Sequence, residues 1–169
     1  MRARVERATD DVDQIIHDLR TAVFALNRRR SEAVSAVSLR AAVLDCAAES
    51  SRVLGFEPTL TFTGPVDALA TSEITAEVLD VVREALANVV RHAHARSVSI
   101  SVDAHEVLEL VIVDDGRGMD SGPLLGQSGG AGNGLRNIVA RAERLGGSAQ
   151  IRSELGVGTT IEWRVPLDR

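Results

Sequence analysis

Residues 107–118, VLELVIVDDGRG, join an apolar run to an acidic, glycine-rich turn. The run predicts a β-strand that pairs as a hairpin with residues 97–104, SVSISVDA. Asp114 ends the strand, and Gly116 and Gly118 follow, which lets the backbone approach a planar ligand closely. A carboxylate in this place can accept a hydrogen bond from an exocyclic amine such as that of adenine. The pattern D-x-G-x-G alone also describes many tight turns, so its meaning depends on its surroundings.

Periodic patterns on both sides of this turn predict three helices and five strands. Amphipathic helices are expected over residues 38–54, 72–95 and 135–145, with Thr71 or Ser72 capping the second and Gly55 ending the first. Strands are expected over residues 58–63, 97–104, 107–114, 148–154 and 159–166. Residues 119–134 are rich in glycine and predict a loop. This order predicts an α+β domain with largely antiparallel pairing.

The first thirty residues carry a different pattern. Apolar or small residues recur at alternating spacings of four and three, at Val5, Thr9, Val12, Ile16, Leu19, Val23 and Leu26. Such a seam is typical of a coiled coil or a helical bundle, and one helix cannot bury it alone. Residues 31–38 are small and polar. We therefore expect a helix in residues 1–30, a linker over 31–38 and the α+β domain over 39–169.

The composition excludes several classes of protein. The net charge of −5 gives no basic field for nucleic acid, and Cys46 is the only cysteine, so no internal disulfide can form. All 19 basic residues are Arg, which excludes the P-loop, protein-kinase and Schiff-base chemistries that need Lys. No apolar run approaches ~18 residues and no signal peptide is visible. We expect a soluble, cytoplasmic chain without direct membrane insertion.

The helix expected over 72–95 carries a second motif. At ~100° per residue, Glu84, Asn88 and Arg91 fall within about 60° of one another. A carboxylate, an amide and a guanidinium in one row can position water, coordinate Mg²⁺ and meet phosphate charge. A solvated helix face with ordinary polar pairs is the alternative. The apolar residues of this helix fall on its other side: Val78, Val82, Leu86 and Val89.

A third motif, Gly132-Asn133-Gly134-Leu135, opens the next helix. Glycine before a helix N-terminus leaves free N–H groups and the positive end of the helix dipole for an anion. A G-x-G pattern alone is weak, but the order of the three motifs is specific.

In this order the motifs resemble a known family. Residues 83–95 (REALANVVRHAHA), 114–118 (DDGRG) and 132–135 (GNGL) resemble the N, G1 and G2 boxes of the GHKL (Bergerat-fold) ATPases. The nearest likeness is to the ATP-binding catalytic domain of bacterial sensor histidine kinases of the NarL-partner type. Residues 54–67, LGFEPTLTFTGPVD, and the short loop point to the mycobacterial dormancy-sensor group. The resemblance covers roughly residues 10–166 and implies a two-layer α/β sandwich with ATP under the loop as a lid.

The resemblance also implies roles for single residues. Asn88 would ligate Mg²⁺, and Glu84 would act as a polarising base or position water. Asp114 would read the adenine amine, and Thr159, in GVGTT, would add a second adenine contact through water. The remaining nucleotide-binding set would be Arg91, His92, Gly116, Gly118, Gly132, Gly134 and Leu135.

Two departures from the family stand out. Many relatives have Lys where Arg91 stands, and only 13 residues separate Gly118 from Gly132. We expect a lid this short to leave ATP more exposed and more weakly held.

His17 lies in residues 15–30, IIHDLRTAVFALNRRR, which look like the phosphorylation box of a histidine kinase. Only about a dozen residues separate Leu26 from the domain start, whereas a returning hairpin helix needs ~20 or more at 1.5 Å each. The stretch also resembles the second hairpin helix of the NarL-partner family. We therefore interpret His17 as a decoy and expect the phosphoacceptor outside this chain.

The expected function is that of the C-terminal part of a sensor histidine kinase. ATP·Mg²⁺ would donate its γ-phosphate to a His in the phosphoacceptor region of the same full-length protein, for relay to an Asp of a response-regulator receiver domain. The full-length protein would carry a sensor region and act as a homodimer. Two alternatives are an anti-sigma-type serine kinase of the same fold and a non-catalytic nucleotide-binding or dimerisation module.

Overall fold

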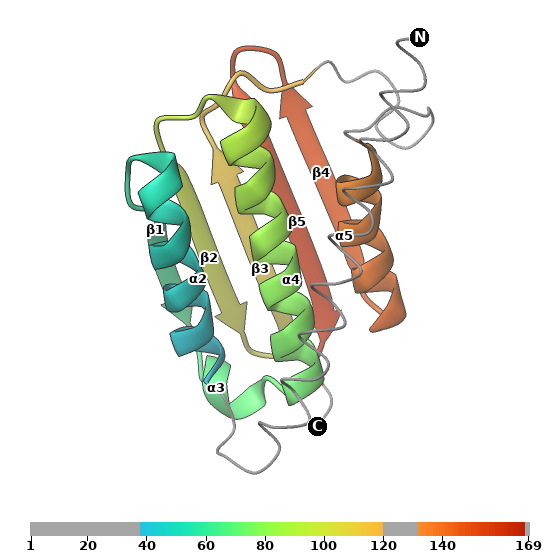
Figure 1. The fold of residues 1–169 in the computed structure, drawn as a ribbon. Coiled ribbons are helices and arrows are strands. Elements are labelled where there is room, and N and C mark those ends of the chain that lie inside the picture. The colour runs from blue at the N-terminus through green and yellow to red at the C-terminus, as the bar shows by residue number, and fades with distance from the viewer. Residues whose placement is uncertain (1–37, 120–131, 168–169) are drawn as a thin grey trace, which may run out of the picture. The chain divides into compact units, whose positions relative to one another are not determined.

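The computed structural model describes residues 38–119 and 132–167. Its helices are α2 (Leu39–Leu54), α3 (Val66–Leu69), α4 (Ser72–Asn88), the π-helical turn η1 (Val89–Ala93) and α5 (Gly132–Arg144). Its strands are β1 (Thr59–Thr63), β2 (Val98–Ala104), β3 (Val107–Asp114), β4 (Ser148–Glu154) and β5 (Gly158–Pro166) (Figure 1). The helix predicted before residue 31, the linker up to residue 37 and His17 lie outside the described residues.

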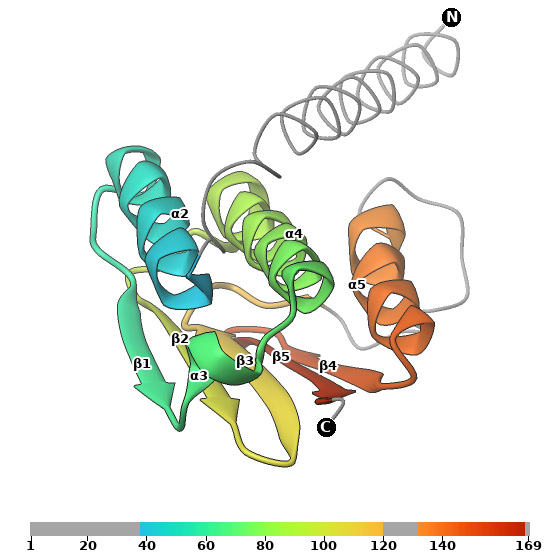
Figure 2. The same cartoon turned by 90° about the horizontal axis from the view of Figure 1, so that it is seen from below.

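The described strands form one sheet in the order β1-β2-β3-β5-β4. β1 and β2 are parallel, and the other three pairs are antiparallel. Figure 2 shows α2, α4 and α5 together on one side of this sheet. The predicted α+β class is confirmed, as are the two-layer arrangement and the mixed, largely antiparallel sheet.

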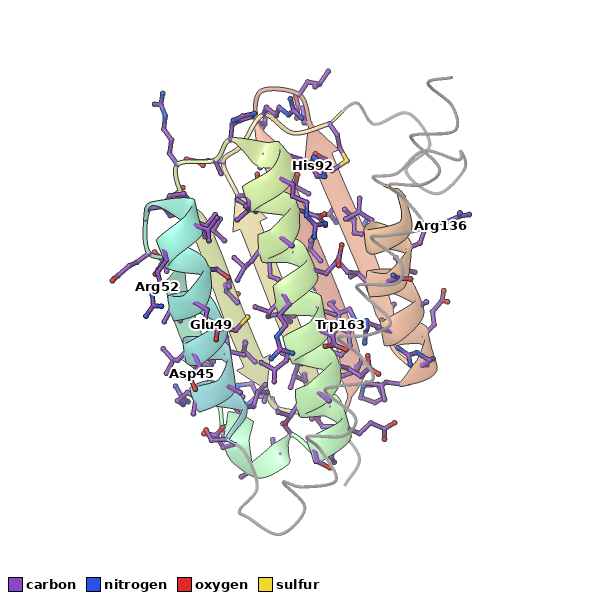
Figure 3. All side chains as sticks on the ribbon, viewed as in Figure 1. Asp45, Glu49, Arg52, His92, Arg136 and Trp163 are labelled. Carbon is purple, nitrogen blue, oxygen red and sulfur yellow. The ribbon has the colours of Figure 1, made fainter. Side chains whose placement is uncertain are left out.

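The core lies between these two layers. The four apolar residues predicted to face away from the polar row on α4 and η1 are buried, with Val89 the most exposed at 5%. Alternate residues of β3 meet them from the sheet, with Leu108, Leu110 and Ile112 at most 2% exposed. Trp163 on β5 is fully buried (Figure 3). Apolar residues spaced by two in the strands and by three or four in the helix therefore face one another across one interface.

The ends of the helices follow local capping rules. The Thr71 hydroxyl oxygen accepts a hydrogen bond from the Ile74 amide at 3.2 Å, so Thr71 and not Ser72 caps α4. Gly55 ends α2 with a φ of 80°, as predicted. The Asp67 carboxylate accepts bonds from the Ser38 hydroxyl at 2.8 Å and from the Arg40 amide at 3.0 Å. This contact ties the start of α2 to α3, a short helix that the sequence did not predict.

The prediction of one continuous helix over 72–95 is wrong in its last turn. The α-helix ends at Asn88, the chain continues as the π-turn η1, and His94 takes a φ of 51°. The physical cause is tertiary: the widened turn presents the Ala93 carbonyl to the Arg117 amide at 2.7 Å. π-turns of this kind occur often at functional sites. A second correction concerns α5, which begins at Gly132 and not at Leu135.

Ion pairs hold α5 against α4. The Arg141 guanidinium lies 2.6 Å from the Glu77 carboxylate and 2.7 Å from the Asp80 carboxylate, and its side chain is 17% exposed. Arg144 reaches the same Glu77 oxygen at 3.2 Å. On the open face of the sheet, Arg152 pairs with Glu162 at 2.8 Å, but its side chain is 60% exposed. Within the described residues, no helix has both the length and the apolar character to span a bilayer.

The two sets of ion pairs predict different costs for losing an arginine. Arg141→Ala removes the closest cation from two carboxylates, those of Glu77 and Asp80, and is expected to lower the free energy of unfolding by about 1–3 kcal/mol. Arg152→Ala breaks an exposed pair and should cost less than about 1 kcal/mol. Urea unfolding followed by the fluorescence of Trp163, the one Trp of a chain without Tyr, measures both. Equal losses for the two variants are the result that contradicts this account.

Candidate functional site

Asp114 lies at the end of β3 and is 8% exposed. Its Oδ1 accepts a hydrogen bond from the Gly116 amide at 2.8 Å. Burial raises the pKa of this carboxyl above its ordinary value of 3.8, although bonds from the Gly116 amide and from the amide and hydroxyl of Thr159 oppose the shift. Thr159 is its pairing partner on β5. The carboxylate is thus withdrawn from water and fixed in orientation.

Gly116 brings the turn after β3 against η1. A Cβ built on Gly116 would lie 2.6 Å from both the Cβ and the carbonyl oxygen of Ala93, so only glycine fits. The neighbouring Asp115 binds the segment before β2. One of its carboxylate oxygens accepts hydrogen bonds from the Arg96 amide at 2.7 Å and the Ser97 amide at 2.9 Å. The bonds from Ser97 and Arg96 lower the pKa of Asp115. Of these two adjacent acids, Asp114 is therefore buried and has a raised pKa, whereas Asp115 is exposed and has a lowered pKa.

Gly118 brings the same turn against the hairpin of β4 and β5. Its φ is 62°, and a Cβ there would overlap the Glu154 carbonyl. The Gly156 amide donates to the Arg117 carbonyl at 2.8 Å, and the Met119 amide donates to the Ser153 hydroxyl at 2.9 Å. The D-x-G-x-G turn is therefore held between η1 and the β4–β5 hairpin. Figure 1 shows the ends of α4 and β3 and this hairpin at the same end of the domain.

Glu84 and Gly134 also meet. A Cβ on Gly134 would overlap the Glu84 carboxylate, so glycine at the start of α5 makes room for this side chain. Asn88 lies one helical turn further along α4. Its Nδ2 is buried and has no hydrogen-bond partner among the described residues. A buried N–H donor without a partner is costly, and an acceptor oxygen of a bound ligand would satisfy it.

The remaining predicted site residues lie on η1 and α5. Arg91 and His92 are exposed on η1, where the helical geometry behind the predicted row of Glu84, Asn88 and Arg91 no longer holds (Figure 3, His92). Leu135 is 3% exposed and lies in the core. Gly132 is the first residue of α5. The groups that do meet are Asp114 with Gly116 and Thr159, Gly118 with the β4–β5 hairpin, and Glu84 with Gly134.

Three residues of the site were missed by the sequence reasoning. Ala93 packs against Gly116, and the Asp115 carboxylate accepts hydrogen bonds from two backbone amides. The Ser153 hydroxyl lies 3.0 Å from the Thr159 hydroxyl. The second acid of DDGRG was a usable signal for Asp115. A serine in a strand and an alanine in a helix carry no local signal of such contacts.

The sequence that forms this site matches a known protein family. Residues 74–169 match the family described as histidine kinase-, DNA gyrase B-, and HSP90-like ATPase. This range is more than half of the chain and contains all three motifs.

Two curated relatives each match more than half of the chain. An uncharacterized sensor-like histidine kinase of Chloroflexus aurantiacus is 34% identical over 100 residues, which are 57% of this chain and 17% of that protein. The sensor histidine kinase LiaS of Bacillus subtilis is 31% identical over 102 residues, which are 60% of this chain and 27% of LiaS. The match therefore covers a minor part of each relative.

Solved structures support the fold. The histidine kinase domain of the Erythrobacter litoralis EL346 blue-light activated histidine kinase superimposes with a TM-score of 0.60 at 20% identity, covering 82% of this chain and 69% of that one. A second structure of that kinase gives a TM-score of 0.55 at 21% identity, covering 73% and 40%.

The close approach at Gly116 predicts a steric cost. Gly116→Ala should lower the free energy of unfolding by about 2–3 kcal/mol, because the new methyl overlaps the Ala93 backbone. Gly55→Ala is the matched control: nothing lies within 4 Å of its Cβ, but its φ is 80°. That variant should lose only about 1 kcal/mol, the cost of a left-handed alanine. Urea unfolding measures both, and a cheaper change at Gly116 than at Gly55 would refute the close contact.

The two adjacent acids predict opposite pH dependences. Because the pKa of Asp114 is raised on folding, the native state binds its proton more tightly, and stability falls as pH rises from 3.8 through the folded value. Asp114→Asn should therefore gain stability relative to wild type as pH rises. Asp115 has a lowered pKa and contributes stability that is lost as pH falls. Asp115→Asn should therefore become less stable relative to wild type as pH rises. The Asp114 effect lies above pH 3.8 and the Asp115 effect mainly below it, so unfolding free energies between about pH 2 and 7 test both signs, and trends of the same sign contradict the assignment.

Proposed function

The chain belongs to the family of histidine kinase-, DNA gyrase B- and HSP90-like ATPases, and from this membership we propose that it is the ATP-binding catalytic domain of a two-component sensor histidine kinase. An ATPase family implies ATP binding. The observation that carries the proposal is Asp114, a desolvated and oriented carboxylate at a strand end, beside the tight D-x-G-x-G turn. The names of both curated relatives favour a histidine kinase over a serine kinase of the same fold.

In this proposal the adenine base lies against the end of β3. Asp114 accepts a hydrogen bond from the exocyclic amine, and the hydroxyl of Thr159 adds a contact through water. Gly116 and Gly118 shape the surface that the base meets. A buried acceptor of this kind selects strongly, since a base without the matching donor leaves the carboxylate unpaired.

The phosphates would extend toward α4 and the start of α5. Asn88 would hold Mg²⁺ through its amide oxygen, and Glu84 would position water or polarise the attacking group. Arg91, His92 and the backbone of Gly132 and Gly134 would meet the phosphates. Among the described residues, no three His, Cys, Asp or Glu side chains are grouped to hold a metal ion. Mg²⁺ commonly takes only one or two protein ligands together with substrate phosphates, so one amide oxygen from this region would be enough. When bound, the ion would neutralise charge that develops on the transferred phosphoryl group.

The rest of the reaction requires parts outside the described residues. We propose that the γ-phosphate passes to a His upstream of this chain and then to an Asp of a response-regulator receiver domain, in a homodimeric full-length protein with a cytoplasmic kinase region. Residues 1–30 would be the tail of its dimerisation helix, and 31–38 a linker. Within the family, the NarL-partner type and the mycobacterial dormancy-sensor group remain the proposed relatives.

The role of Asn88 predicts a specific loss of metal dependence. For the wild type, Mg²⁺ should tighten ATP binding by about tenfold, whereas for Asn88→Ala the affinity with and without Mg²⁺ should agree within about threefold. Gln150→Ala, which removes an amide from an exposed strand position, is the matched control and should behave as wild type. Calorimetry with and without Mg²⁺ gives the four constants for each protein. An undiminished Mg²⁺ effect in Asn88→Ala removes this residue from the metal site.

The proposed position of the phosphoacceptor predicts that this chain does not label itself. Incubation with radiolabelled ATP and Mg²⁺ should leave the chain without acid-labile phosphate, and His17→Ala should change nothing. Label that appears on the wild type and disappears in His17→Ala overturns both the decoy interpretation and the proposed domain boundary.

A further inference from the structure

Ser153 lies on β4 next to the site and is 7% exposed. Its hydroxyl oxygen is 2.9 Å from the Met119 amide nitrogen, 3.1 Å from the Gly158 carbonyl oxygen and 3.0 Å from the Thr159 hydroxyl oxygen. These three groups belong to the turn after β3 and to the start of β5. One small side chain therefore joins both sides of the proposed base-binding surface.

The number of protons on these groups limits which of them can donate and which can accept each hydrogen bond. A hydroxyl has one proton to donate and two lone pairs to accept with. The Met119 amide occupies one lone pair of Ser153, and the Gly158 carbonyl and the Thr159 hydroxyl are both within reach of the Ser153 proton. Thr159 is paired with Asp114 across β3 and β5, and hydrogen bonding from its amide and hydroxyl opposes the rise in the pKa of the Asp114 carboxyl. When its own proton points at Asp114, Thr159 can only accept from Ser153.

In that arrangement a chain of hydrogen bonds would run from the Met119 amide through Ser153 and Thr159 to Asp114. Without Ser153, the Thr159 hydroxyl would lose the neighbour on the side away from Asp114 and could rotate about its χ1 bond. Buried polar networks of this kind orient their members because each lost bond leaves a group unsatisfied.

We propose that Ser153 is a positioning residue for base selection: it fixes the Thr159 hydroxyl and with it the acceptor that Asp114 presents to the 6-amino group of a purine. This inference rests on the proposed ATP site. A purely structural serine, which only holds the Met119 amide, would affect all nucleotides alike. A serine that orients Thr159 and Asp114 affects the ligands that differ at position 6 of the purine.

Adenosine and inosine triphosphates separate these two roles, because they differ at position 6 by an amine donor against a carbonyl acceptor. Dissociation constants of both Mg²⁺ complexes are measured for wild type, Ser153→Ala, Ser153→Thr and Ser148→Ala. Ser148 is an exposed serine at the start of the same strand and serves as the matched control. Trp163 fluorescence verifies that each variant is folded.

Wild type should prefer adenosine triphosphate by at least about tenfold, one charge-assisted hydrogen bond. Ser153→Ala should lower this preference by about three- to tenfold, with the inosine constant changed by less than about twofold. Ser148→Ala should keep the preference, and Ser153→Thr, which retains the hydroxyl, should restore most of it.

A double-mutant cycle tests the path through Thr159. If Ser153 acts through that hydroxyl, then adding Ser153→Ala to Thr159→Val should change the preference no further. Independent, additive effects overturn the inference even if Ser153→Thr proves too large for the site.

The outcomes distinguish a failure of the Ser153 role from a failure of the proposed adenine site. If wild type binds neither nucleotide, or binds both equally, the proposed adenine site fails and the role of Ser153 fails with it. If wild type prefers adenosine triphosphate but Ser153→Ala weakens both nucleotides equally or neither, only the role of Ser153 is refuted.

Discussion

The arrangement of the site depends on placing one carboxylate, that of Asp114, out of water at the end of a strand. Burial penalises its charge, so the chain must supply hydrogen bonds locally, and it does so from the Gly116 amide and from Thr159 across the strand pair. Gly116 can do this only by lying against Ala93, where no side chain fits. The π-turn at the end of α4 and Gly116 together place this amide beside the carboxylate.

Asp115 completes this arrangement although it is fully exposed. Its bonds to the Arg96 and Ser97 amides fix the segment between η1 and β2, while Asp114 faces the site. The β4–β5 hairpin closes the other side through Gly156 and Ser153. At the far side of α4, the half-buried pairs of Arg141 hold α5 in place, and the start of α5 receives Glu84 at Gly134. The proposed base and phosphate regions are thus supported by separate sets of contacts.

Much of the fold could be predicted because it follows from local periodicity and capping. Val78 and Val82 on α4 and alternate residues of β3 are buried as their spacing requires. The π-turn could not be predicted, because it results from the Ala93–Arg117 contact between residues far apart in sequence. For the site, the acid and glycines of DDGRG carry a local signal, whereas Ser153 gains its contacts to β5 and to the Met119 amide only when the chain folds. The predicted alignment of Arg91 with Glu84 and Asn88 assumed a continuous α-helix, and this helix ends at Asn88.

The central claim is that Asp114 is the adenine-reading group of an ATP site, and calorimetric titration with ATP·Mg²⁺ tests it most directly. Wild type should bind with a dissociation constant between micromolar and millimolar, roughly 4–8 kcal/mol. Asp114→Asn, which should remain folded at neutral pH, is expected to bind at least about tenfold more weakly because its amide can present a donor to the adenine amine. Equal affinity in the two proteins, or no binding by a folded wild type, would contradict the account.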